Sequence, residues 1–294
     1  MDFGRILRRA FDYTFKYKSL WVLGFFSTFF GNTYGFIDRE NQTNAAGILF
    51  GNPTLLIFLI IYAMTLFFLF IVMHLISTAG LIDAIAGLED GRKYELKNSF
   101  KVGTDTFWRF LGLWLLLIAT VLAVAVILAV PIVVAFILST LLGILFLIAL
   151  IPAALAAYFV IDMIYLFAQR EIVIRRQKIG DAVVTGYFLL KNNLPGNVIA
   201  FFIISGIGLV MFALSSLLVL IFALPLIMAG TTQAAAIVFI MLFIEVPIFI
   251  AVAILITGSF GTFQNSILTI YYLKIRALSA PAAAPLPGRD PRAL

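Results

Sequence analysis

The sequence predicts an all-α, polytopic integral membrane protein with six transmembrane helices, and three observations lead to this fold class. Of the 294 residues, 63% are hydrophobic and 12% are charged, whereas a soluble protein has about 25% charged residues. Five apolar runs reach the length of about 20 residues that a helix needs to cross a bilayer. The basic residues gather in the segments between these runs, as the positive-inside rule describes for cytoplasmic loops.

The predicted spans follow one another along residues 1–276, which we expect to form a single transmembrane domain. A first run, 19–31, is short and rich in Phe, so it either crosses the bilayer or dips into it and returns. The five longer runs are 54–82, 110–133, 139–168, 197–228 and 235–273. Because the stretch from Phe110 to Ile161 has no charge and is too long for one crossing, it must turn between Pro131 and Gly143.

Charge placement decides between the two interpretations of the first run. Nineteen of the twenty Lys and Arg residues lie in 1–18, 83–109, 169–196 and 274–294, and Arg39 is the exception. If 19–31 crosses, these four segments share the cytoplasmic side, which agrees with the positive-inside rule. The sequence therefore predicts six spans with both termini in the cytoplasm.

The chain end and the aromatic residues beside the basic segments fit this arrangement. Residues 277–294 are rich in Pro and Ala, so we expect a disordered cytoplasmic tail. Aromatic rings prefer the headgroup level of a bilayer. The rings expected at the inner face are those of Trp21, Trp108, Tyr271 and Tyr272.

Two segments read as amphipathic helices lying in the inner interface. In 3–18, apolar residues share one helical face and basic residues the other, a pattern typical of interfacial helices. The pattern recurs in 179–193, with Asp181 as the expected N-cap and a break at Leu194-Pro195-Gly196, and more weakly in 96–110. The basic residues that we expect to contact anionic lipid are Arg5, Arg8, Arg9, Lys16, Lys18, Arg175, Arg176 and Lys178.

These helices recur at a regular spacing. With Phe11, Phe100 and Val183 taken as equivalent, the spacings are 89 and 83 residues. Each unit would hold one cytoplasmic helix and two spans, so three units would share one orientation in the membrane. The other interpretation is that any junction between an interfacial helix and a span looks this way.

Three stretches, ILRRAFDYTFKYKSLWVLGFF, QREIVIRRQKIGDAVVTGYFLLKNN and GSFGTFQNSILTIYYLKIR, resemble a broad group of bacterial polytopic membrane proteins. The group includes the membrane domain fused to some glycerophosphodiester phosphodiesterases and many stand-alone proteins of unknown function. The resemblance covers residues 1–276 and implies a bacterial inner membrane and an even number of helices. It brings no active-site residue to this chain, because it does not involve the phosphodiesterase domain.

Two carboxylates lie within predicted spans, where ionisable groups are candidate functional sites. Glu245 lies near the middle of its span, two residues before Pro247, and Asp162 lies at a similar depth in another span. One interpretation is a shared proton or cation site, with the carbonyl of Phe243 freed by Pro247 as a further polar group. The other is that each carboxylate is satisfied by a neighbour, Asp162 by a Tyr or Arg near the inner interface.

The remaining patterns exclude several classes of function. The chain has no Cys and a single His, His74, which we expect to be a satisfied interfacial residue, so no metal site or cofactor is predicted. No phosphate loop or hydrolase motif occurs, and the positive charge fits a lipid surface better than nucleic acid. We therefore expect a non-enzymatic membrane subunit, scaffold or lipid-interacting element, with anionic lipid, another membrane protein or a second copy as partner. The alternative is a small transporter or channel-like protein that uses Glu245 and Asp162.

Packing between the spans should involve small and polar residues. Ala153 and Ala157, and likewise Gly258 and Thr262, have the spacing that lets two helix backbones approach. Gln264 and Asn265 are placed to bond across helices.

Overall fold

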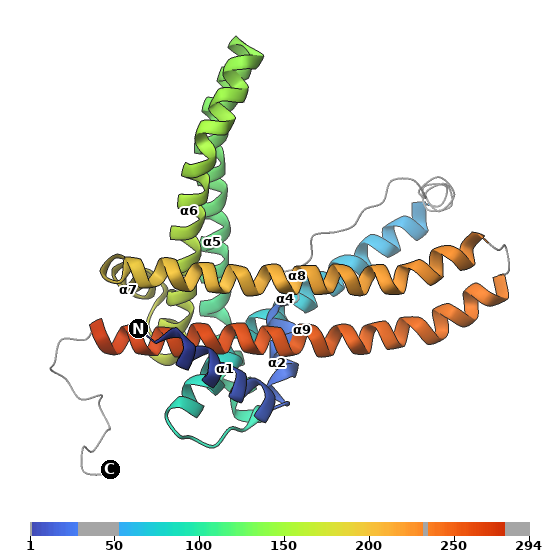
Figure 1. The fold of residues 1–294 in the computed structure, drawn as a ribbon, viewed down its shortest axis with the longest axis horizontal. Coiled ribbons are helices and arrows are strands. Elements are labelled where there is room, and N and C mark those ends of the chain that lie inside the picture. Colours follow the sequence, from blue (N-terminus) through green and yellow to red (C-terminus); the bar gives the residue numbers. More distant parts are fainter. Residues whose placement is uncertain (1, 29–52, 232–234, 280–294) are drawn as a thin grey trace. The chain divides into compact units, whose positions relative to one another are not determined.

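The computed structural model describes residues 2–28, 53–231 and 235–279, and within these ranges the protein consists of α-helices and short connections (Figure 1). The helices are α1 (Phe3–Lys16), α2 (Leu20–Thr28), α4 (Pro53–Glu89), α5 (Leu96–Leu138), α6 (Thr140–Ile174), α7 (Ile179–Asn192), α8 (Leu194–Thr231) and α9 (Ala235–Ser279). The predicted all-α class is confirmed for the described residues.

Among the described residues, five helices are long and apolar enough to cross a membrane: α4, α5, α6, α8 and α9. They correspond to the five long runs found in the sequence. The sixth expected span, 19–31, is described only as the nine residues of α2, and its last three residues and Arg39 lie outside the described ranges. The sixth crossing therefore stays a prediction.

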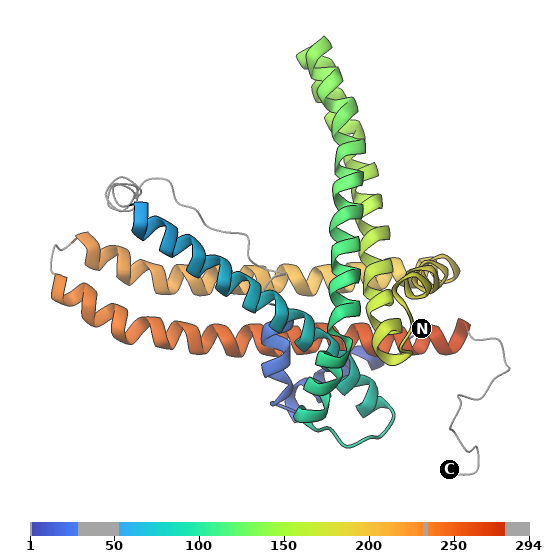
Figure 2. The ribbon, with the colours of Figure 1, turned by 180° about the vertical axis from the view of Figure 1, so that it is seen from behind.

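The turn expected between Pro131 and Gly143 is confirmed at Ser139, between α5 and α6. Ser139 alone leaves the helical conformation, with φ −166° and ψ 138°. The Phe136 ring packs directly over the Cα of Gly143 and leaves no room for a side chain there. The two helices run side by side in both views (Figures 1 and 2), so the uncharged stretch forms an antiparallel hairpin.

Two of the three expected interfacial helices are separate elements. The α1 helix ends at Lys16, before α2 begins, and α7 ends at Asn192, so that one residue separates it from α8. The prediction of a separate helix at 96–110 was wrong, because α5 runs without a break from Leu96. No proline lies in α5 before Pro131, so nothing in its first part removes a backbone donor and ends the helix.

The start of α7 also differs from the prediction. The N-cap is Lys178, whose backbone is extended, and Asp181 lies in the first turn instead. An acidic residue in the first turn still favours the helix, because the unpaired N–H groups there carry partial positive charge. The acidic residue at the start of the helix was predicted correctly, but its position within the first turn was not.

The chain divides into two compact units, each described by itself below. Unit 1 comprises Met1–Leu7, Arg109–Ile204 and Ile267–Leu294. Unit 2 comprises Arg8–Trp108 and Ser205–Ser266. Asp162 belongs to unit 1 and Glu245 to unit 2, so their expected proximity stays a prediction.

Burial changes sharply along three of the long helices. Every residue is buried in 77–82 of α4, 167–173 of α6 and 266–272 of α9. By contrast, the most apolar stretch of α6 holds no buried residue, and that of α4 is only 6% buried. A helix buried on all faces is surrounded by protein, so these three runs mark where each helix packs most closely.

Candidate functional site

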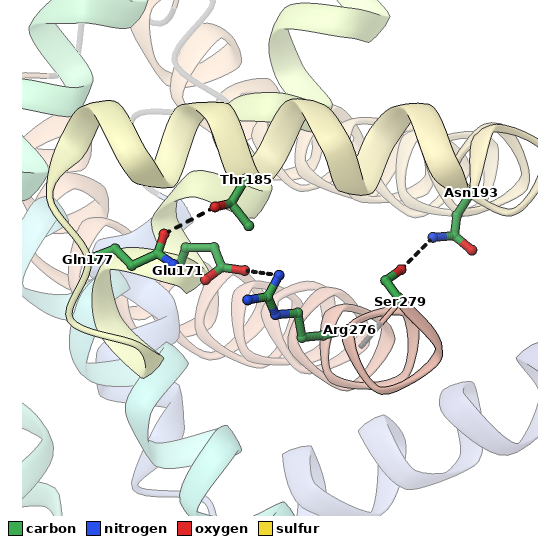
Figure 3. A network of polar contacts seen from close by, with 6 residues as sticks. All are labelled: Glu171, Gln177, Thr185, Asn193, Arg276 and Ser279. Atoms are coloured by element: carbon green, nitrogen blue, oxygen red, sulfur yellow. Dashed lines mark hydrogen bonds and ion pairs between the residues drawn. The ribbon is translucent and has the colours of Figure 1, made fainter. Parts of the chain in front are cut away.

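The buried run of α6 carries an ion pair in unit 1. The side chain of Glu171 is fully buried, and its Oε1 lies 3.4 Å from Nη1 of Arg276 on α9 (Figure 3). The hydroxyl of Tyr272 and the cation of Arg175 also interact with this carboxylate, although Tyr272 lacks the geometry of a full hydrogen bond. Breaking such a buried pair costs more than forming it gains, so the contact holds α6 and α9 in one register.

Arg170 lies beside Glu171 and is likewise 0% exposed. Its Nη1 donates to the carbonyl of Leu166 at 2.7 Å, and its charge interacts with Asp162, Tyr165 and Tyr272. The Asp162 carboxylate thus has a buried guanidinium as its electrostatic partner. We call Asp162, Arg170, Glu171, Tyr272 and Arg276 the polar cluster.

Asn197 joins three helices next to this cluster. Its amide nitrogen donates to the carbonyls of Leu189 at 3.1 Å and Leu190 at 3.0 Å, in the last turn of α7. Its amide oxygen accepts a 2.7 Å hydrogen bond from the hydroxyl of Tyr271 on α9. A longer contact of 3.1 Å between Asn193 and Ser279 closes the same corner (Figure 3). The end of α7 is therefore fixed by side-chain amides.

Two sequence-based interpretations are refined in this region. Tyr271 and Tyr272 were expected in an aromatic belt at the headgroups, and each is only 1% exposed, so both rings pack on protein. Their depth in the membrane stays a prediction. Residues 169–174 were placed beyond the end of the predicted span 139–168, and they continue α6. The available signal was Gln-Arg-Glu at 169–171, followed at once by apolar residues with no helix breaker, which a count of charges treats as loop.

The two carboxylates predicted as a shared site lie in different settings. Asp162 is half-buried in α6, near Arg170. Glu245 is half-buried in α9, and no hydrogen bond or ion pair connects it to the other described residues. Pro247 lies inside α9 and is exposed, as is Phe243 at 85%. The proposed use of the Phe243 carbonyl as a ligand stays a prediction.

In unit 2, α1 is fixed to the end of α4. Nη1 of Arg9 lies 2.8 Å from Oε2 of Glu89. Burial and the adjacent Glu89 carboxylate together raise the pKa of Tyr13 to about 12. The indole N–H of Trp21 donates to the carbonyl of Thr14 at 2.8 Å. Glu89 is therefore part of the attachment of α1.

Small residues bring α2 and α9 together in unit 2, at the positions expected from the sequence. A side chain on Gly24 would collide with the carbonyl of Gly258 and with Thr262. The Thr262 hydroxyl lies 3.0 Å from the carbonyl of Leu20, to which it can donate across the helices. Asn265 makes a 3.4 Å contact with the hydroxyl of Ser27. The predicted close packing at Gly258 and Thr262 and the bond from Asn265 are confirmed, whereas Ala153, where close packing was also expected, is exposed.

The basic residues expected to contact lipid lie on the surface. They are exposed, as the sequence predicts for a solvent or headgroup contact: Arg5, Arg8, Arg9, Lys16, Lys18, Arg175, Arg176 and Lys178. Arg5 pairs with Asp2 at 3.5 Å and Arg9 pairs with Glu89. Arg8, which lies between them in the sequence, makes no ion pair inside the described ranges. Lipid binding itself stays a prediction.

The residues that the structure describes form no candidate metal site, because no three His, Asp or Glu side chains lie close together among them. Nδ1 of His74 lies 3.0 Å from the carbonyl oxygen of Phe26, so the ring has a backbone partner. No protein-family model, curated protein or solved structure matches this chain. The resemblance to the membrane domain of some phosphodiesterases therefore stays a prediction.

Proposed function

We propose that the protein is a non-enzymatic, six-span protein of a bacterial inner membrane that organises anionic lipid at the cytoplasmic face, as a subunit or scaffold. The observation that carries the proposal is the arrangement of α1. Its buried face, with Ile6 and Ala10 at 0% exposure, packs on protein. The edge beside this face presents the aromatic rings of Phe11 and Phe15, and the opposite face presents exposed basic side chains, a combination that suits a bilayer interface.

The six-span topology is supported by charge and tested by labelling. Because the chain has no Cys, single cysteines report one position each. Lys97→Cys and Lys191→Cys should react with an impermeant maleimide only in inverted vesicles, and Arg39→Cys only in right-side-out vesicles. Labelling of Arg39→Cys and Lys97→Cys from the same side would reject the topology.

A threefold repeat is supported by how the interfacial segments pack. Each has two buried small residues four positions apart, aligned by the predicted equivalence: Ala10 and Thr14, Ser99 and Gly103, Ala182 and Gly186. A side chain on Gly103 would meet the carbonyl of Ile76 on α4, and one on Gly186 the carbonyl of Ile164 on α6. Within its own unit, each of these two segments thus lies on the span before it, and α1 lies beside α9.

Lipid retention tests the function. The purified full chain should carry phosphatidylglycerol in preference to phosphatidylcholine when it is taken from vesicles of both and weighed by native mass spectrometry. Losing one exposed cation should weaken this preference, because each basic residue near an anionic surface contributes about 1 kcal/mol. A protein released without bound lipid, or with the two lipids in the vesicle ratio, would reject the proposal.

A small transporter is the second candidate, favoured by the half-buried Glu245 within an apolar helix. A carboxylate in this position is expensive in a membrane and is commonly kept for ion or proton movement. Proton flux into liposomes that contain the protein, abolished by Glu245→Gln, would support this candidate. Flux at the level of empty liposomes, or unchanged by the substitution, would remove it.

A further inference from the structure

An apolar groove of about 160 Å³ lies between α1 and α9 in unit 2. Its walls are the side chains of Phe11, Thr14, Phe15, Ser259, Phe260 and Phe263. Both hydroxyl groups in the wall already donate within their own helices, Thr14 to Ala10 at 2.8 Å and Ser259 to Ile256 at 3.0 Å. The groove therefore offers hydrocarbon and aromatic surface to whatever enters it.

The aromatic wall is held in place from the α1 side. The ion pair between Arg9 and Glu89 and the bond from Trp21 to Thr14 fix the rotation of α1 in unit 2. In this rotation Phe11 and Phe15 keep 54% and 49% exposure, and their ring centroids are 4.4 Å apart. Because α1 is fixed and both rings remain about half exposed, Phe11 and Phe15 form a surface that an apolar ligand can contact.

A cation stands on the same edge of α1 as these rings. Arg8 precedes Phe11 by three residues and Phe15 by seven, which places it on their side of the helix. It is exposed and has no ion pair within the described ranges. An apolar groove with a free guanidinium at its edge suits an amphiphile with a negative head, whereas a soluble anion would gain nothing from the Phe side chains.

We propose that this groove holds an acyl chain of an anionic phospholipid and that Arg8 binds its phosphate. The inference rests on the proposed function, because it gives the lipid-organising role a specific site. Guanidinium groups bind phosphate oxygens through paired hydrogen bonds, and burying each CH₂ of the chain adds to the affinity. The interfacial helix α1 supplies the polar end, and the span α9 supplies the apolar end.

Unit 1 contains a second apolar groove, between α5 and α6, that lacks a nearby cation. It is bounded by Val121 and Leu128 on α5 and by Ala154 and Ile161 on α6, among others. Between Arg109 and Arg170 these two helices carry no Lys or Arg. This second groove should accept acyl chains without preferring anionic headgroups, so the chain supplies its own control.

Photocrosslinking compares the two grooves in the full chain. A benzophenone-bearing phenylalanine replaces Phe260 in one protein and Ile161 in the other, in vesicles of phosphatidylcholine with a minor share of phosphatidylglycerol and identical acyl chains. Mass spectrometry then gives the ratio of the two lipids in each adduct. We expect phosphatidylglycerol to be enriched about fivefold at Phe260, the effect of one basic residue near an anionic lipid. At Ile161 the ratio should equal that of the vesicle.

Arg8→Gln should return the ratio at Phe260 to that of the vesicle without changing the adduct yield at Ile161, which also shows that the variant is folded. Phe263→Trp, which fills the groove, should lower the total lipid adduct at Phe260. Equal enrichment at both sites, or enrichment that survives Arg8→Gln, would overturn the inference. A vesicle ratio at Phe260 in a protein that still retains phosphatidylglycerol would reject the groove alone, whereas loss of both signals would reject the proposed function too.

Discussion

The two ends of α6 differ sharply in burial. Its most apolar stretch has no buried residue, and Leu145 and Ile148 there are 53% and 58% exposed. Residues 167–173 near its end are all buried, although they include Gln169, Arg170 and Glu171. In this chain, the residues that a soluble protein would bury are exposed, and three polar residues that it would expose are buried.

Lipid explains the difference. Hydrocarbon tails are as apolar as Leu, so they give no reason for apolar helices to leave them, and helices associate through close packing and polar contacts. The described contacts follow this rule: Gly24 admits the backbone of α9, Thr262 bonds to α2, and Arg276 pairs with Glu171. Hydropathy therefore marks where the chain meets lipid, and small or polar residues mark where it meets itself.

The largest effect should come from breaking the polar cluster. Arg276→Ala leaves the Glu171 carboxylate buried without its main partner, which typically costs about 3–5 kcal/mol. Because Arg175 also interacts with this carboxylate, we expect a loss of about 3 kcal/mol. The free energy of unfolding, measured by SDS titration of the protein in mixed micelles, checks this value.

The double variant Glu171→Gln with Arg276→Met is the control. It removes both charges at similar volume, so it should recover most of the stability that Arg276→Ala loses. If Arg276→Ala costs no more than substitution of an exposed cation such as Lys191, the buried end of α6 is not held by this pair.

The long apolar helices could be predicted from the sequence, because length and hydropathy are averaged over many residues. The five long runs and the turn at Ser139 follow from composition. The break between α7 and α8 was predicted at Leu194-Pro195-Gly196, but it lies at Asn193, and these three residues begin α8 because proline is tolerated in the first turn of a helix. The pairing of Gly258 and Thr262 with α2 was visible as a spacing, although the partner helix was not. Each of these patterns lies within one segment of the chain, so it can be recognised without knowing which helices contact each other.

The polar cluster was not within reach, because it depends on which helices meet. Arg170 and Glu171 look like loop residues until α9 supplies Arg276 and Tyr272. The same holds for Asn197, whose three partners lie on α7 and α9. A charge count assigns such residues to the surface, and only tertiary contacts distinguish a buried cation from an exposed one.

Glycine substitutions should have the next largest effect on the free energy of unfolding, and they compare a helix contact with an exposed position. Gly24→Ala places a methyl group against the Gly258 carbonyl and Thr262, both on the neighbouring helix, and overpacking of this kind costs about 1–3 kcal/mol. Gly206→Ala, in α8, meets no atom within 4 Å and should be neutral or slightly stabilising. Unfolding in mixed micelles separates the two. Equal responses would mean that α2 and α9 are not in contact.

Two leucines on α5 test the contrast without any polar group. Leu113 is 2% exposed and Leu115 is 54% exposed. Leu113→Ala leaves a cavity and should cost about 1–2 kcal/mol, below the range of about 2–5 kcal/mol known from soluble cores, because lipid removes much of the transfer term. Leu115→Ala should change the free energy of unfolding by less than about 0.5 kcal/mol, since lipid fills the space. A similar loss from both would show that Leu115 is also covered by protein.

The smallest effect concerns one hydrogen bond between helices. Thr262→Val keeps the volume but removes the hydroxyl that lies 3.0 Å from the carbonyl of Leu20, and such bonds are worth about 0.6 kcal/mol in a membrane protein. Thr65→Val is the matched control, because its hydroxyl bonds only to Ile61 in its own helix, at 2.8 Å, and is exposed. A loss at Thr262 that exceeds the loss at Thr65 by about this amount would assign the difference to the contact between α2 and α9. Equal losses would mean that both hydroxyl groups donate only within their own helices and contribute nothing between helices. The close packing of α2 and α9 would then depend on the glycines.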